Sequence, residues 1–309
     1  MKDKKLNRKD FLEDIQIVEF TSRLPGPLAG HLFSDYGAKV TKIDLLREDP
    51  FNNSELSKRN PLFQSWYDVI NEQKDLISLT NVEQLQEPQV RALLAQADVL
   101  IIALGPKQRE KLYYLLDQNE HWKDKVILEI VASEDEKKYL HDLNVLAQQG
   151  LLKFLNLKKK ENKHLPLLPF GGIVFSTQIV SDVMAALLKK QKHKGNLIVK
   201  SGLEQAVQRT LGPLKAPSNI DSLALHNGKF PCYNIYSLKC GKYVALGSIE
   251  PHFWQTFLET LSLPKELNAF DESGNVYKEI QTVFDSKTAA ELGELLQNKG
   301  HFCLDIFEA

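Results

Sequence analysis

Short apolar runs alternate with amphipathic stretches through the first half of the chain. Apolar runs rich in β-branched residues predict buried strands, and the stretches between them carry helical periodicity. Strands are expected at residues 15–20, 39–44, 75–80, 98–104 and 125–131, and helices at 28–37, 82–97 and 107–116. Strands separated by helices of this length are typical of a parallel sheet with helices on both faces. The pattern therefore predicts an α/β fold with a Rossmann-like large domain.

The pattern changes after residue 140. Helical periodicity dominates residues 143–154, 173–190 and 203–211. A second, smaller unit begins near Asn227 and contains two strand-like runs, 233–238 and 242–248, joined at 239–241 as a hairpin, followed by a helix from Glu250. We expect a large domain over residues 1–225, which includes the helical linker region, and a small α+β domain over 226–309.

Composition excludes several classes of protein. The formal net charge is −1, so the chain lacks the electrostatic footprint of a nucleic-acid binder. Its three cysteines are scattered without a CxxC pair, which indicates neither a disulfide framework nor a metal site. The N-terminus has no apolar core of a secretory signal. No uninterrupted apolar run approaches the roughly 18 residues that span a bilayer. We expect a cytoplasmic protein with no membrane partner.

The first candidate site follows the first strand, where the sequence reads SRLPGPLAG from Ser22 to Gly30. Pro25 and Pro27 restrict the turn, and Gly26 lets a ligand or a second backbone come close. The helix that follows offers free N–H groups to an anion. The run is not GxGxxG, so it does not indicate a nicotinamide or flavin cofactor. From spacing alone, a tight strand-to-helix turn is the simpler interpretation.

Several longer stretches resemble the class III CoA-transferase and α-methylacyl-CoA racemase family of CaiB/BaiF type. The run IVEFTSRLPGPLAGHLFSDYGAKVTKID resembles the family's opening, and residues 195–212 and 240–262 resemble two later regions. The resemblance implies a class III CoA-transferase fold and a coenzyme A thioester as substrate or ligand, with no covalently bound cofactor. The implied CoA-binding residues are Arg23, Gly26, Pro27, Lys42, Arg47 and Lys74. An exposed arginine is, however, more often plain surface.

Two catalytic residues are implied by the same resemblance. His141 begins the segment HDLN, which resembles the G-H-D-[IV]-N-Y segment that carries the proton-abstracting histidine of the racemase branch. A histidine suits that task because its ordinary pKa lies near 6.5. Glu250, in GSIEPHFW, matches the glutamate that pairs with this histidine. The alternatives are a structural histidine at a helix start and a carboxylate that favours a helix N-terminus.

The sequence also departs from the family. Just before Gly171 and Gly172 the family carries an aspartate, the nucleophile of transferases and the second base of racemases. Here the segment reads LPLLPFGG, with Leu168 or Pro169 in that place. Neither side chain can form the covalent carboxylate intermediate. The family pattern also continues beyond HFCLDIFEA, so we expect a missing return segment and an altered form of the family's intertwined homodimer.

Two hypotheses therefore remain open. The first is an enzyme acting on acyl-CoA thioesters, closer to the racemase branch because both His141 and Glu250 are present. The second is a catalytically impaired homologue that keeps a CoA-thioester pocket or serves as a structural partner protein. The absent aspartate favours the second hypothesis.

Overall fold

The computed structural model describes residues 7–45, 49–117, 123–135, 138–152, 168–215, 225, 228–297 and 302–308. The chain forms two compact units, Met1–Ala216 and Pro217–Ala309. Each unit has its own hydrophobic core. They are called unit 1 and unit 2 below.

In the described part of unit 1, six strands form a parallel sheet. The strands are β1 (Gln16–Phe20), β2 (Lys39–Leu45), β3 (Asp75–Leu79), β4 (Val99–Ile102), β5 (Val126–Val131) and β6 (Leu197–Gly202). Their order is β3-β2-β1-β4-β5-β6, and every neighbouring pair is parallel. This is the strand order of doubly wound folds, whose direction reverses between β1 and β4. The predicted α/β fold with a parallel sheet is confirmed.

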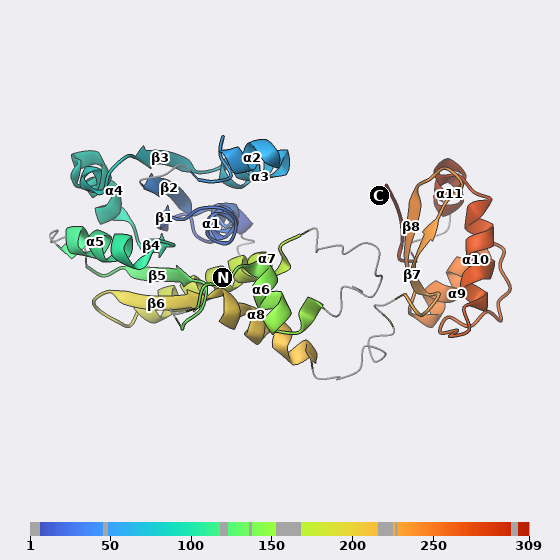
Figure 1. The fold of residues 1–309 in the computed structure, drawn as a ribbon. Coiled ribbons are helices and arrows are strands. Elements are labelled where there is room, and N and C mark those ends of the chain that lie inside the picture. Colours follow the sequence, from blue (N-terminus) through green and yellow to red (C-terminus); the bar gives the residue numbers. More distant parts are fainter. Residues whose placement is uncertain are drawn as a thin grey trace, which may run out of the picture. The chain divides into compact units, whose positions relative to one another are not determined.

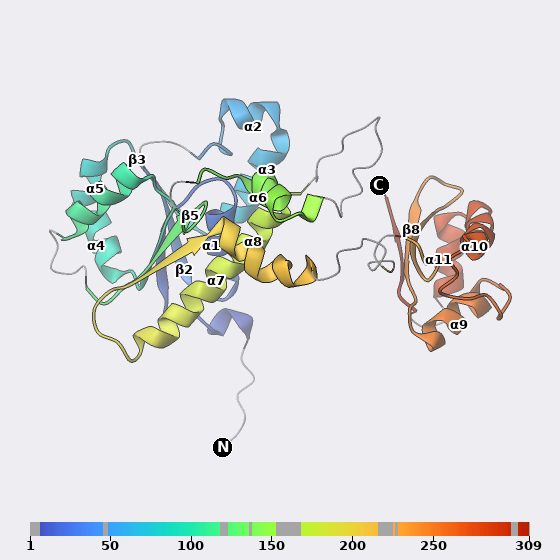
Figure 2. The ribbon, with the colours of Figure 1, turned by 60° about the horizontal axis from the view of Figure 1, so that its bottom comes forward.

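Helices cover both faces of this sheet (Figures 1 and 2). One face packs against α1 (Pro25–Asp35), α6 (Asp142–Gln148), α7 (Phe170–Lys190) and α8 (Leu203–Leu211), and the other against the 3-10 helix Val82–Gln86, α4 (Pro88–Gln96) and α5 (Pro106–Asp117). Alternate residues along a strand pack into the cores on the two faces of the sheet. Ile17 joins the first core and Val18 the second, because successive side chains of a strand point to opposite sides.

Several element boundaries differ from the prediction. The helix expected over 82–97 is divided at Pro88, which begins α4 because proline fits the first turn of a helix and not its interior. The helix expected over 143–154 ends at Gln148, before Gly150 with a φ of 68°. Strand β6 and the helices α2 (Glu55–Arg59) and α3 (Pro61–Asn71) were not predicted.

Helix α7 is long and apolar enough to cross a bilayer by length and composition alone. In unit 1 it is a core helix. Phe175, Ile179 and Val183 recur at helical spacing, are almost fully buried and belong to the core between the helices and the sheet. These three side chains are buried against the sheet without a membrane.

The described residues of unit 2 form a three-stranded antiparallel sheet and three helices. The strands are β7 (Tyr233–Ser237), β8 (Tyr243–Gly247) and β9 (Leu304–Phe307), in the order β7-β8-β9. The helices are α9 (Pro251–Thr260), α10 (Asn275–Asp285) and α11 (Ala289–Leu296). The predicted hairpin is confirmed, and Gly241 supplies the positive φ of its turn. Strand β9 and helices α10 and α11 were not predicted.

Candidate functional site

A cavity of about 630 Å³ opens at the carboxyl ends of β1, β4 and β5 in unit 1. Ligands of open α/β sheets bind at this edge, where the strand order reverses. Most of its lining is apolar, with Phe51, Phe63 and Trp66 on one side and Leu168, Pro169 and Phe175 among the rest. The rings of Phe51 and Phe63 stack with centroids 4.3 Å apart. We call it the apolar cavity.

His141 lines the apolar cavity at the start of α6. It is the N-cap residue, and its backbone N–H donates to Asn144 Oδ1 at 3.0 Å. The side chain is exposed. The local hydrogen bond holds the backbone of His141 at the cavity wall.

Leu168 and Pro169 line the same cavity at the start of α7. Pro169 is the N-cap residue of α7, and its side chain makes no capping hydrogen bond. The cap comes instead from another helix, because Asp142 Oδ1 accepts a hydrogen bond from Gly172 N at 2.7 Å. The starts of α6 and α7 are therefore tied together at the cavity wall.

Asp142 is the one carboxylate among the described residues that line the apolar cavity. Burial raises its pKa, and hydrogen bonds from the N–H groups of Gly172 and Gly171 oppose that shift. Gly171 is required at this point because a Cβ atom there would lie 2.6 Å from Asp142 Oδ1. The carboxylate thus sits against the backbone of the Gly-Gly pair.

A second cavity of about 450 Å³ adjoins the first at Ser22, Arg23 and Ala103, which line both. Its lining is more polar and includes Asp44 from the end of β2 and Gln108 from α5. We call it the polar cavity. Arg23 is exposed and stands where the two cavities meet.

Lys42 is fully buried rather than exposed to a cavity. Its ammonium group lies 2.5 Å from Asp44 Oδ1 and 3.3 Å from Asp49 Oδ2, and donates to the carbonyl oxygen of Thr21. Burial lowers the pKa of Lys42, but Asp49 and Asp44 outweigh burial and the net shift is upward. Its charge is therefore balanced inside the protein.

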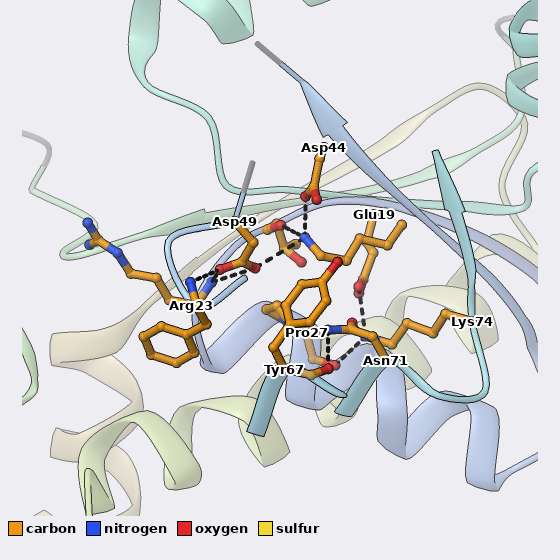
Figure 3. Close-up of polar contacts among 11 residues, drawn as sticks. Glu19, Arg23, Pro27, Asp44, Asp49, Tyr67, Asn71 and Lys74 are labelled. Carbon is orange, nitrogen blue, oxygen red and sulfur yellow. Dashed lines mark hydrogen bonds and ion pairs between the residues drawn. The ribbon is translucent and has the colours of Figure 1, made fainter. Parts of the chain in front are cut away.

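Lys74 is also enclosed (Figure 3). Its Nζ lies 2.8 Å from Glu19 Oε1 and donates to the carbonyl oxygen of Pro27 and to Asn71 Oδ1. Burial lowers the pKa of Lys74 and raises that of Glu19, each against the attraction of the other. The pair fastens α1 to β1 and to the end of α3.

Residues 12–308 match the sequence model of CoA-transferase family III. The chain belongs to CoA-transferase family III. It is 27% identical to a CaiB/baiF CoA-transferase family protein of Caenorhabditis elegans, over 96% of this chain and 87% of that protein. It is 26% identical to the α-methylacyl-CoA racemase of Mus musculus, over 91% of this chain and 73% of the racemase. The resemblance seen in the sequence is confirmed at the level of the family.

The chain is also similar to a CoA-transferase and to solved crystal structures. The (R)-2-hydroxy-4-methylpentanoate CoA-transferase of Clostridioides difficile is 24% identical, over 79% of this chain and 64% of that protein. A crystal structure of a CaiB/BaiF family protein from Brucella suis matches with a TM-score of 0.65 at 16% identity, covering 91% of this chain and 80% of that one. A hypothetical protein from Mycobacterium tuberculosis matches with a TM-score of 0.65 at 20% identity, covering 96% and 84%. These two structures share the fold.

The site residues predicted from the family resemblance lie in different parts of the structure. His141, Arg23, Leu168 and Pro169 line the apolar cavity. Gly26 and Pro27 are buried in α1, where a Cβ on Gly26 would lie 2.5 Å from Thr21 Cβ. Arg47 lies outside the described residues. Glu250 is the exposed N-cap residue of α9 in unit 2, and Pro251 follows at the first helical position.

Two structural features beside the cavities were missed in the sequence. Asp49 is buried and connects to the Arg23 turn, yet it follows an ordinary stretch with no motif. The aromatic wall of Phe51, Phe63 and Trp66 comes from a segment whose helices were not predicted. Pro61, which begins α3, was the available signal for that helix.

Proposed function

We propose that the chain binds an acyl-CoA thioester, with the acyl group in the apolar cavity and the nucleotide portion in the polar cavity. Coenzyme A thioesters combine a charged nucleotide with an apolar acyl chain, and two adjoining cavities of matching character support such a ligand. Arg23 stands at the junction, where a guanidinium suits a phosphate. The observation that carries the proposal is the position of His141 on the wall of the apolar cavity.

The chemistry proposed for His141 is abstraction of the proton next to the thioester carbonyl. The imidazole takes the α-proton, and the electron pair of that C–H bond moves into the thioester carbonyl to give an enolate. The imidazolium exchanges its proton with solvent and then protonates the same carbon, as the electron pair returns from the enolate oxygen and restores the thioester. Racemisation by two bases needs a group on each face of that carbon, and Leu168 and Pro169 offer none. Transfer through an acyl anhydride needs a carboxylate nucleophile, which these two residues also lack. We therefore propose proton exchange by a single base.

Asp142 is interpreted as a helix cap rather than as the missing carboxylate. One of its oxygens is held by Gly172 N, and this hydrogen bond stabilises the first turn of α7. Burial raises the pKa of Asp142 overall, against the hydrogen bonds from Gly172 and Gly171, so the helix-cap interpretation rests on the hydrogen-bond geometry. Glu250 as partner of His141, the intertwined homodimer and the cytoplasmic location stay predictions.

The test is exchange of the α-proton of a 2-methylacyl-CoA in D₂O, followed by NMR or mass spectrometry. His141→Ala is expected to lower the exchange rate at least about 100-fold, the usual contribution of a general base. Binding of the thioester, measured by calorimetry, should change little. His193→Ala is the matched control, because His193 is an exposed histidine in the turn after α7 and outside the lining of the apolar cavity. Equal exchange in wild type and His141→Ala would contradict the role of His141.

A second candidate function is binding of the thioester without turnover. The apolar residues in place of the family aspartate favour it. Its signature is measurable binding of acyl-CoA to the wild type with no exchange above the rate in buffer. Absence of any binding would contradict both candidates.

A further inference from the structure

Arg23 has a backbone conformation that is unusual for an arginine. Its φ is 65°, in the left-handed region that costs a residue with a side chain about 1 kcal/mol or more. It lies between the end of β1 and the start of α1, at the junction of the two cavities. Some other contact must hold the residue in this conformation.

That contact is the carboxylate of Asp49 (Figure 3). The N–H of Arg23 donates to both oxygens of Asp49, at 3.0 Å each, and the N–H of Phe51 donates to Oδ1 at 3.0 Å. Asp49 is 1% exposed. One buried carboxylate therefore fastens the Arg23 turn and the start of the aromatic wall, two segments that both line the apolar cavity.

Lys42 supports the carboxylate from inside the sheet. Its ammonium lies 3.3 Å from Asp49 Oδ2, and it also donates to the carbonyl oxygen of Thr21, two residues before Arg23. Lys42 thus contacts the Arg23 turn and the carboxylate that holds it. A buried charge with an ion-pair partner and further hydrogen bonds has a single favourable position, which makes it a rigid support.

The side chain of Arg23 leaves this anchored backbone in the direction away from Asp49 (Figure 3). Asp49 binds the backbone of Arg23 and leaves the guanidinium uncommitted to that carboxylate. We propose that Asp49, supported by Lys42, is a positioning residue that presents the Arg23 guanidinium to an anionic group of the ligand at the cavity junction. This inference rests on the proposed binding of an acyl-CoA thioester.

The experiment is a double-mutant cycle on the affinity for coenzyme A, measured by calorimetry. Asp49→Asn keeps the shape of the side chain and loses its charge, and Arg23→Ala removes the guanidinium. Each variant is expected to weaken binding about tenfold, the loss of one hydrogen bond to a charged group. If Asp49 acts through Arg23, the double variant binds as weakly as Arg23→Ala alone. Independent losses that multiply to about 100-fold would overturn the inference.

Glu19→Gln is the matched control. It neutralises a carboxylate that is buried in the same region and pairs with Lys74, and Glu19 neither contacts Arg23 nor lines either cavity. Its affinity for coenzyme A is expected to equal that of the wild type, provided that circular dichroism shows it folded at the assay temperature. Weakening by Glu19→Gln equal to that by Asp49→Asn would indicate a general effect of buried charge and overturn the inference.

The outcomes separate this inference from the proposed function. Wild-type protein that binds neither coenzyme A nor a 2-methylacyl-CoA contradicts the proposed function itself. Wild-type protein that binds coenzyme A with an affinity unchanged by a folded Asp49→Asn variant contradicts only the positioning role. Non-additive loss with unchanged binding by the control supports both.

Discussion

At the scale of single residues, the buried Glu19–Lys74 pair shows how a candidate ligand contact can be a structural ion pair. Lys74→Met is expected to destabilise unit 1 by about 3–5 kcal/mol, because it leaves the Glu19 carboxylate buried without its partner. The double variant Glu19→Gln with Lys74→Met should recover much of that loss. Urea unfolding of the wild type and of these two variants measures both effects.

The Lys74→Met variant should also change how stability depends on pH. Burial already raises the pKa of Glu19 above its ordinary value of 4.5, and removal of Lys74 takes away an opposing attraction. A carboxyl group whose folded pKa is raised contributes most to stability below its unfolded pKa and loses that contribution as pH rises. The variant is therefore expected to approach wild-type stability as pH falls toward 4.5. A deficit that stays constant across this range would contradict the assignment.

Cys240 and Cys232 should differ in reactivity, because one thiol is exposed and the other is buried. Cys240 is exposed, and hydrogen bonds from the N–H groups of Lys242 and Ala289, the latter at the start of α11, lower the pKa of its thiol. Cys232 is buried, and burial raises its thiol pKa. Iodoacetamide is expected to label Cys240 before Cys232 near neutral pH and to reach Cys232 only on unfolding. Peptide mass mapping would contradict this if Cys232 were labelled first.

At the scale of elements, the start of α7 depends on its contact with α6. Gly171→Ala places a methyl group against Asp142 Oδ1 and displaces the cap, so we expect a loss of about 1 kcal/mol. Gly172→Ala is the matched control, since its Cβ finds its nearest neighbour, Leu24 Cδ2, at 3.4 Å. It should be neutral or stabilising by up to about 1 kcal/mol, as for other helical glycines. Equal losses in urea unfolding would exclude a role of the Asp142 contact.

At the scale of the whole molecule, two separate cores predict two unfolding transitions. Phe284 lies in the core of unit 2 and Leu100 in a core of unit 1, both fully buried. Phe284→Ala should cost unit 2 about 3–5 kcal/mol and Leu100→Ala should cost unit 1 about 2–5 kcal/mol. Differential scanning calorimetry should show each variant lowering a different transition. A single transition lowered by both variants would contradict independent cores.

The family, the parallel sheet and the absence of a carboxylate at Leu168 and Pro169 could all be read from the sequence alone. Apolar periodicity reports which residues are buried along one element, and long matching runs report ancestry, so both can be read without coordinates. Elements with a weak or interrupted apolar pattern were not predicted from the sequence. Among these are β6, an edge strand with alternating exposed positions, and the short helix α2.

Which polar residues contact one another could be seen only in the folded chain. Lys42 and Arg23 both looked like contacts for a phosphate, yet one is fully buried beside Asp49 and Asp44 and the other lines two cavities. Asp142 reaches Gly172 across a sequence separation of 30 residues, and Asp49 reaches Arg23 across 26. Such pairings depend on how helices cross the sheet, a long-range property that no local pattern encodes.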